Sequence, residues 1–109
     1  MTDSTTTLDD LQTRGMEIAA LYDELNLAQR GRTWTRAETM MGFVGDVGDL
    51  AKLVMAAEGA RSDVGGREAL EHELADCLWA VLVLAKRYDV DLAAAYTSTM
   101  DDLAARLTR

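Results

Sequence analysis

Apolar residues recur along this chain at steps of three and four positions, the spacing that places side chains on one face of an α-helix. This pattern predicts four helices, at approximately residues 8–30, 36–58, 67–88 and 92–107. Three of them follow a residue whose side-chain oxygen can cap a helix N-terminus, namely Thr7, Thr35 and Asp91. No segment alternates polar and apolar residues as a half-buried strand does, so we predict an all-α fold.

The predicted helices differ in how much apolar surface they carry. The first has a narrow apolar seam that contains Gly15, where the missing side chain permits a neighbouring helix to approach closely. The second is apolar nearly all round, and so is the part of the third helix over residues 78–85. Helices of this kind are typical of the centre of a fold, so we expect both to be largely buried.

The distribution of polar and apolar segments also predicts the domain organisation. Residues 1–6 are polar and predict a disordered tail, residues 59–66 carry the turn signals of a loop, and residues 7–109 form a single domain. A chain of 109 residues has little capacity to cover two apolar helices and a seam by itself. We therefore predict a four-helix, bundle-like domain that assembles as a dimer or higher oligomer.

Composition narrows the function classes. The chain is 49% apolar and has no proline, which favours a folded, helical protein. Its net charge of −8 argues against binding to nucleic acid or to an anionic membrane. Its only cysteine, Cys77, excludes an internal disulfide and fits a reducing compartment. Residues 1–7 lack the apolar core of a signal peptide, and the apolar run over residues 77–85 is too short to span a membrane. We expect a soluble cytoplasmic domain.

Two carboxylate pairs carry the candidate chemistry. Asp46 and Asp49 lie three residues apart on the second predicted helix, and Glu73 and Asp76 have the same spacing on the third. Each pair falls on one side of its helix, among apolar residues, although like charges that close destabilise a helix. Facing each other, the pairs would form a cage of oxygens that suits Mg²⁺. The alternative is that these acids belong to solvated helix surfaces.

Residues 45–51, with the letters GDVGDLA, and residues 73–79, with the letters ELADCLW, resemble two motifs of the MazG-like, all-α nucleoside triphosphate pyrophosphohydrolases. The dCTP pyrophosphatase-like branch of that family is the most similar, and the resemblance covers roughly residues 20–100. It implies an α-helical bundle, assembled as a homodimer or homotetramer, that cleaves a nucleotide between its α- and β-phosphates. It also implies that the catalytic metal ligands are Asp46, Asp49, Glu73 and Asp76, with Mg²⁺ as the cofactor and Mn²⁺ as its alternative.

The chain departs from the family pattern at positions that matter for binding. Aspartate stands at 46 and 49 where the family has glutamate, so each side chain reaches less far. Thr99 and Leu103 stand where that branch has a lysine and an asparagine. Phosphate binding would then depend on other cations, of which Lys52, Lys86 and Arg87 are the candidates. Trp34 matches an aromatic near the family's base pocket; the alternative is a loop side chain that covers the core.

Other residues with chemical potential have simpler interpretations. His72 lies off the inward-facing stripe, so we interpret it as a surface residue rather than a base or a ligand. Cys77 lacks a histidine partner and is expected to be a small core residue. Phe43 and Trp79 fit the apolar patterns of their own helices and are likewise expected in the core. The chain contains neither the glycine-rich dinucleotide motif nor a P-loop.

The leading hypothesis is a Mg²⁺-dependent pyrophosphohydrolase that converts unwanted or excess nucleoside triphosphates, with ribose or deoxyribose, to monophosphates and pyrophosphate. Its proposed substrate contacts are Trp34 and Lys52. The rival is a catalytically silent helical oligomerisation or regulatory module that keeps the fold. The departures from the family pattern favour the rival, whereas carboxylates placed among apolar residues favour the enzyme. A coiled-coil adapter is disfavoured because no heptad pattern continues beyond the first helix.

Overall fold

A computed structural model of the chain describes residues 5–59 and 65–108, and these residues form four helices without a strand. The helices are α1 (Leu8–Arg30), α2 (Arg36–Ala57), α3 (Gly66–Arg87) and α4 (Leu92–Leu107). The predicted all-α fold is therefore confirmed, with each helix within one or two residues of its expected bounds. Most of the predicted tail, residues 1–4, and most of the predicted loop, residues 60–64, lie outside the described residues.

The helix ends follow from the predicted caps. The Thr7 side chain accepts a hydrogen bond from the backbone N–H of Asp10, whose carboxylate accepts one from the N–H of Thr7. Thr35 and Glu38 form the same reciprocal pair at the start of α2. Asp91 caps α4 by accepting from the N–H of Ala94. Each cap satisfies backbone donors that the first helical turn leaves without a partner.

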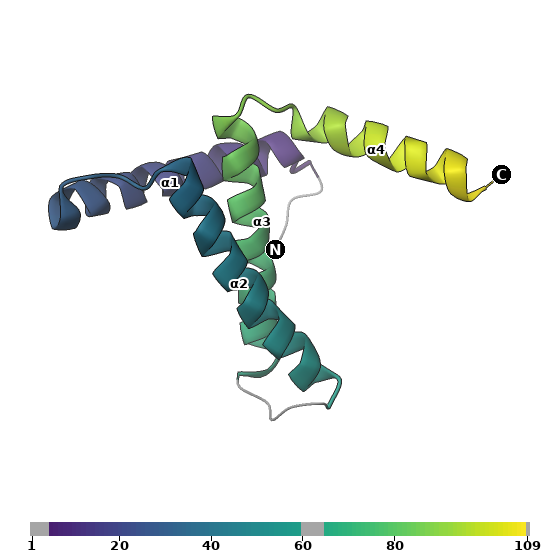
Figure 1. The fold of residues 1–109 in the computed structure, drawn as a ribbon, viewed down its shortest axis with the longest axis horizontal. Coiled ribbons are helices and arrows are strands. Elements are labelled where there is room, and N and C mark those ends of the chain that lie inside the picture. The colour runs from purple at the N-terminus through teal and green to yellow at the C-terminus, as the bar shows by residue number, and fades with distance from the viewer. Residues whose placement is uncertain (1–4, 60–64, 109) are drawn as a thin grey trace.

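Two helices form the body of the molecule, and the other two are attached at one of its ends. α2 and α3 lie side by side and run in opposite directions (Figure 1). α1 crosses the end of α3 that is distant from the α2–α3 loop, whereas α4 leads away from that end. None of the described helices is both long and apolar enough to cross a membrane.

The core lies where α1 crosses α3. Here the missing side chain of Gly15 leaves space for the Trp79 ring, since a Cβ added to the glycine would come within 3.3 Å of that ring. Trp79 Nε1 donates a hydrogen bond to the Gly15 carbonyl oxygen at 2.9 Å. This contact confirms the close helix approach predicted at Gly15. The buried apolar residues among those described are Ala19 of α1, four residues of α3 (Ala80, Leu82, Val83 and Ala85), and Leu53, which lies on α2 towards the α2–α3 loop. The apolar half of α3 is buried as expected.

The expectation that α2 is largely buried is wrong for the single chain. Leu53 is the one buried apolar residue of α2, a helix that the structure describes throughout, while Met40, Val44 and Val47 are 44%, 51% and 43% exposed. The reason is geometric, because α3 covers one side of α2 and α1 lies against α3 rather than α2. Apolar periodicity shows that a helix has apolar faces but does not show what covers them.

The chain is more open than its mass predicts. Its radius of gyration is 16.7 Å, whereas a compact domain of this length has about 13 Å. It exposes 8151 Å² at 11.9 kDa, whereas a compact monomer of that mass exposes about 5,900 Å². α4, which is described throughout, has no buried residue and so contributes to the exposed area. Three helices thus pack together, and the fourth stands apart from them.

Candidate metal centre and cleft

Three of the four predicted carboxylates meet between α2 and α3. Asp46 and Asp49 reach out from α2 and Glu73 from α3, and each offers an oxygen within 4.8 Å of those of the other two. The two motifs come together because the helices are antiparallel neighbours and each motif lies near the middle of its helix. Asp46 and Glu73 are half-buried, and Asp49 is exposed. The structure thus places oxygens from both motifs close enough to share one ion.

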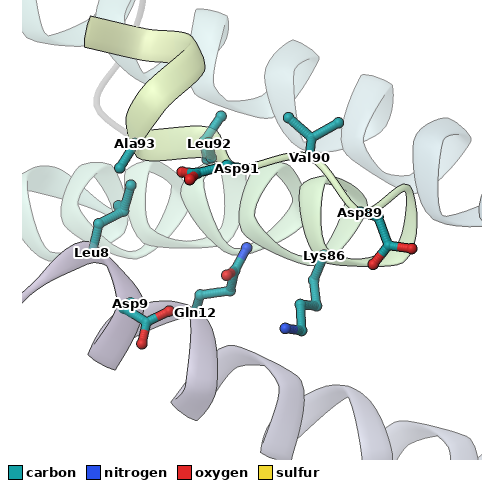
Figure 2. Close-up of a pocket in the computed structure, with 9 residues that line it drawn as sticks. All are labelled: Leu8, Asp9, Gln12, Lys86, Asp89, Val90, Asp91, Leu92 and Ala93. Carbon is teal, nitrogen blue, oxygen red and sulfur yellow. The ribbon is translucent and has the colours of Figure 1, made fainter.

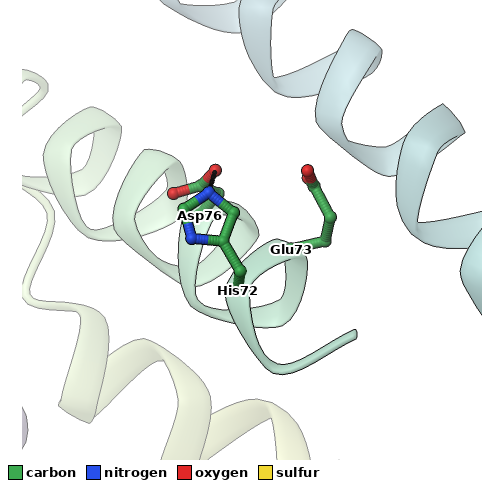
Figure 3. A group of neighbouring side chains, drawn as sticks. All are labelled: His72, Glu73 and Asp76. Carbon is green, nitrogen blue, oxygen red and sulfur yellow. Dashed lines mark ion pairs between the residues drawn. The ribbon is translucent and has the colours of Figure 1, made fainter. Parts of the chain in front are cut away.

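The fourth carboxylate, Asp76, has a partner that sequence reasoning missed. His72 Nε2 lies 3.1 Å from Asp76 Oδ2, one helical turn along α3 (Figure 3). His72, Glu73 and Asp76 also offer ligand atoms within 4.8 Å of one another. The His72 side chain is 72% exposed, as expected of a surface residue, but it is tied to the site. The sequence does indicate this pair, because His72 and Asp76 are four residues apart and therefore lie next to each other on one face of a helix.

The cluster costs electrostatic free energy in the absence of a cation. Burial raises the pKa of Glu73, and the charges of Asp46, Asp76 and Asp49 raise it further. Burial is also the main cause of the raised pKa of Asp46, followed by the charges of Asp76 and Asp49. Glu73 Oε2 is buried and has no hydrogen-bond partner among the described residues. A buried carboxylate oxygen without a partner is destabilising, so this oxygen is a candidate for binding a cation.

The donor set fits a hard divalent cation. Carboxylate oxygens are the ligands that Mg²⁺ and Mn²⁺ prefer, and Glu73 supplies a buried one that has no hydrogen-bond partner within residues 5–59 and 65–108. Asp46 and Asp49 provide further oxygens from α2. Although each aspartate is one methylene shorter than the glutamate of the resembled motif, its oxygens still reach within 4.8 Å of Glu73. The shorter reach therefore does not separate the ligands.

A cleft of about 630 Å³ adjoins these carboxylates. Asp46 and Asp76 line it together with four aromatic side chains, Tyr22, Trp34, Phe43 and Trp79. Trp79 stacks at a tilt on Tyr22 with ring centroids 5.7 Å apart, while its indole nitrogen binds α1. Trp79 and Phe43, expected only in the core, therefore also line the cleft. A cavity of this size with aromatic walls can hold a planar ligand such as a nucleobase.

The cleft also has a polar side that the sequence did not reveal. Asn26 is buried, and its Oδ1 accepts from Arg30 Nη1 at 2.6 Å, so its amide N–H groups stay available to other acceptors. Arg87 lies 3.8 Å from Asp23 and donates to Thr39 at 3.4 Å. All five residues line the cleft. In the sequence, these polar residues look like parts of solvated helix faces. They are recognised as one wall of a cleft only when the packing of the three helices is known.

The three candidate phosphate-binding cations lie in different places. Arg87 lines the cleft, but Asp23 and Thr39 already bind its guanidinium. Lys86 lines a separate hollow between the start of α1 and the α3–α4 connection (Figure 2). Lys52 is exposed on α2 and is not among the described lining residues of the cleft. The proposed contact between Lys52 and substrate therefore has no support in this geometry, and Arg87 is better placed.

Cys77 lies beside the carboxylates rather than in the centre of the core. It is half-buried, and burial raises the pKa of its thiol, as do the charges of Asp46, Glu73 and Asp76. A raised pKa keeps the thiol protonated, and the protonated form is neither a good nucleophile nor a good metal ligand. The interpretation of Cys77 as a packing residue therefore agrees with its surroundings.

No protein-family model matches the chain, and no curated protein matches its sequence. The resemblance to the MazG-like enzymes thus rests on the two motifs alone, and membership of that family stays a prediction.

Proposed function

We propose that this chain is a divalent-metal-dependent nucleoside triphosphate pyrophosphohydrolase, which cleaves nucleoside or deoxynucleoside triphosphates to monophosphates and pyrophosphate. The observation that carries the proposal is the buried Oε2 of Glu73, which has no hydrogen-bond partner in the described part of the chain and belongs to a group of like-charged carboxylates from two helices. A stable fold has no use for such an arrangement unless a cation joins it. The adjoining aromatic cleft gives the site room for a nucleotide.

The residues divide into metal holders and a residue that handles the proton. Asp46, Asp49 and Glu73 would hold Mg²⁺ or Mn²⁺, because their oxygens converge. The bound ion supplies charge neutralisation for a triphosphate and lowers the pKa of an attacking water. Asp76, the fourth predicted ligand, is held by His72 at 3.1 Å and lines the cleft. It is placed to accept the proton that this water loses.

The cleft would bind the base and sugar of the substrate. Trp34 is 44% exposed and lines the same cleft as Asp46, so a base could stack on its ring while the phosphates extend towards the carboxylates. The amide N–H groups of Asn26 are hydrogen-bond donors for a base or sugar acceptor. The substrate class is thereby a nucleotide, and its base preference depends on the polar side of the cleft.

One observation favours the catalytically silent module as a second candidate. Both arginines that line the cleft already have partners: Asp23 and Thr39 bind Arg87, and Asn26 accepts from Arg30. Lys52 is not among the described lining residues of the cleft. A triphosphate would therefore depend on the metal and on a rearranged Arg87 for its neutralisation. The enzyme is preferred because a silent module would gain stability by losing the buried charge of Glu73.

The proposed enzyme acts as a homo-oligomer, either a dimer or a tetramer. The chain exposes 8151 Å², about 2,200 Å² more than a compact monomer of its mass. Stable obligate interfaces bury about 2,000 Å² or more in total, so an excess of this size is enough for one. Its exposed apolar residues on α1 and α2, including Leu21, Tyr22, Val44 and Val47, are typical of surfaces that subunits cover.

Pyrophosphate release from a panel of nucleoside triphosphates, with Mg²⁺ or Mn²⁺, tests this function. The informative variant is Glu73→Gln, which keeps the shape of the side chain and removes its charge. Glu71→Gln on the same helix is the matched control, because Glu71 is exposed and outside the cluster. We expect metal-dependent release by the parent chain and by the control, and none by Glu73→Gln. Absence of release from all three folded proteins with every nucleotide would favour the silent module.

A further inference from the structure

The fourth helix needs a partner that its own chain does not supply. α4 has 16 residues and no buried residue along its described length. Isolated helices of that length are marginal in water, because most helical stability in proteins comes from packing of an apolar face. α4 leads away from the α2–α3 pair, so no helix of its own chain lies along it (Figure 1).

The apolar residues of α4 form a regular seam. Five of them follow one another at steps of three, four, three and four positions. This line is separate from the seam of the first helix and spans only two heptads, so it predicts a short helix–helix contact rather than a sustained coiled coil. The seam consists of Ala93, Tyr96, Met100, Leu103 and Leu107. Tyr96, Met100 and Leu103 are 63%, 39% and 40% exposed, so the seam faces solvent in the single chain. A narrow line of this kind fits one further helix rather than a broad surface.

The residues beside the seam suit a helix of the same sequence. The positions that flank the seam are Thr97, Thr99, Ala104 and Arg106, so Arg106 is the one charged flanking residue. The acids of α4, Asp101 and Asp102, lie at positions directed away from the contact line. Two copies of a chain with net charge −8 can therefore approach through α4 without placing like charges opposite each other.

We propose that α4 packs along its seam against α4 of a second copy of this chain, around a two-fold axis. Such an isologous contact uses the same patch on both subunits, as the self-complementary seam requires. The chain exposes 8151 Å² in total, whereas a compact monomer exposes roughly 5,900 Å². The α4 contact would cover part of that excess. This inference rests on the oligomer within the proposed function and is independent of the hydrolase activity.

Two substitutions of the same chemistry test the contact by mass and dissociation constant, measured by light scattering and analytical ultracentrifugation on the full chain. Met100→Asp places a charge in the centre of the seam, and Ser98→Asp places it on the opposite side of α4. We expect Met100→Asp to weaken the dimer by at least tenfold and Ser98→Asp to leave it unchanged. Equal dissociation constants for both variants and the parent chain would overturn the proposal.

Cross-linking keeps the test decisive if an aspartate disturbs folding. In a Cys77→Ser background, we introduce either Met100→Cys or Ser98→Cys and treat each protein with a short bismaleimide. The proposal predicts a covalent dimer for Met100→Cys and little for Ser98→Cys. A dimer in solution without a Met100→Cys cross-link would overturn the α4 contact alone. A chain that is monomeric at all concentrations would overturn the oligomer as well, while pyrophosphate release would still report on the hydrolase separately.

Discussion

The two halves of α3 have opposite effects on the stability of the fold. Its C-terminal half buries Leu82 and Val83 against α1 and α2, where apolar burial stabilises the fold. Its N-terminal half carries Glu73, whose oxygens meet those of Asp46 and Asp49, and Asp76, which is paired with His72. Burial and the charges of the three aspartates raise the pKa of Glu73. One helix thus combines a region that holds the chain together with a region that weakens it. Sites that keep an unfavourable electrostatic arrangement are candidates for function.

The two halves of α3 also differ in what they need for stability. The apolar half is largely buried in the single chain, with Leu78 at its edge still 44% exposed, because α1 and α2 both pack on α3. The carboxylate half leaves Glu73 Oε2 without a hydrogen-bond partner among the described residues. The first half therefore depends only on packing, and the second is completed by a ligand. The predictions that follow separate these two dependencies.

The largest expected effect is in the apolar half. Leu82→Ala removes a side chain that is 3% exposed and should lower the free energy of unfolding by about 2–5 kcal/mol. Leu78→Ala is the matched control on the same helix, since Leu78 is 44% exposed and leaves a smaller cavity. Urea unfolding followed by circular dichroism measures both. Equal losses would mean that the apolar half is not packed as described.

The carboxylate half should respond in the opposite direction. Without metal, Glu73→Gln should raise the free energy of unfolding, because the neutral amide no longer repels Asp46 and is less costly to bury, by on the order of 1 kcal/mol. Glu71→Gln, an exposed change on the same helix, should stay within about 0.5 kcal/mol of the parent chain. The same urea experiment, with a chelator present, gives both values. A clear loss of stability in Glu73→Gln would contradict the repulsion.

The pH dependence follows from the raised pKa values of Asp46 and Glu73. A carboxyl whose pKa is higher in the folded chain binds more protons there, so stability falls as pH rises between the unfolded and folded pKa values. Above that window the contribution is constant. We expect the metal-free parent chain to lose more stability across this window than the Asp46→Asn, Glu73→Gln double variant. Parallel pH profiles would contradict this account.

The smallest predicted effect uses Cys77 as a probe of the local field. Burial and the charge of Asp46 raise the pKa of its thiol. Asp46→Asn removes that charge and should increase the rate of Cys77 alkylation a few-fold at mildly alkaline pH, because more thiolate is present. Asp23→Asn, a change of the same kind that is not among the causes of this shift, should leave the rate unchanged. Equal alkylation rates for Asp46→Asn and the parent chain would mean that the charge of Asp46 does not raise the pKa of the Cys77 thiol.

Local periodicity predicted much of this structure. The four helices, the caps at Thr7, Thr35 and Asp91, and the close approach at Gly15 all depend on residues within a few positions or on one missing side chain. The meeting of Asp46 and Asp49 with Glu73 followed from two motifs on consecutive helices. These features could be predicted because an antiparallel pair brings equivalent levels of neighbouring helices together.

Features that depend on which helix covers which face could not be predicted in this way. The exposure of Val44 and Val47 follows from α1 lying against α3 instead of α2. The polar wall of the cleft joins Asn26 of α1 to Arg87 of α3, residues far apart in the sequence with no shared motif. The spacing of four between His72 and Asp76 permits their ion pair, but the same spacing is common on solvated helix surfaces and does not by itself indicate a site.

Divalent-cation binding at the carboxylate cluster tests the central claim most directly. Thermal unfolding is followed with and without Mg²⁺ or Mn²⁺ for the parent chain, Glu73→Gln and Glu71→Gln. A ligand that binds only the folded state stabilises it, so the parent chain and Glu71→Gln should gain stability with metal while Glu73→Gln should not. The same gain in all three proteins, or no gain in the parent chain, would contradict a metal site built around Glu73.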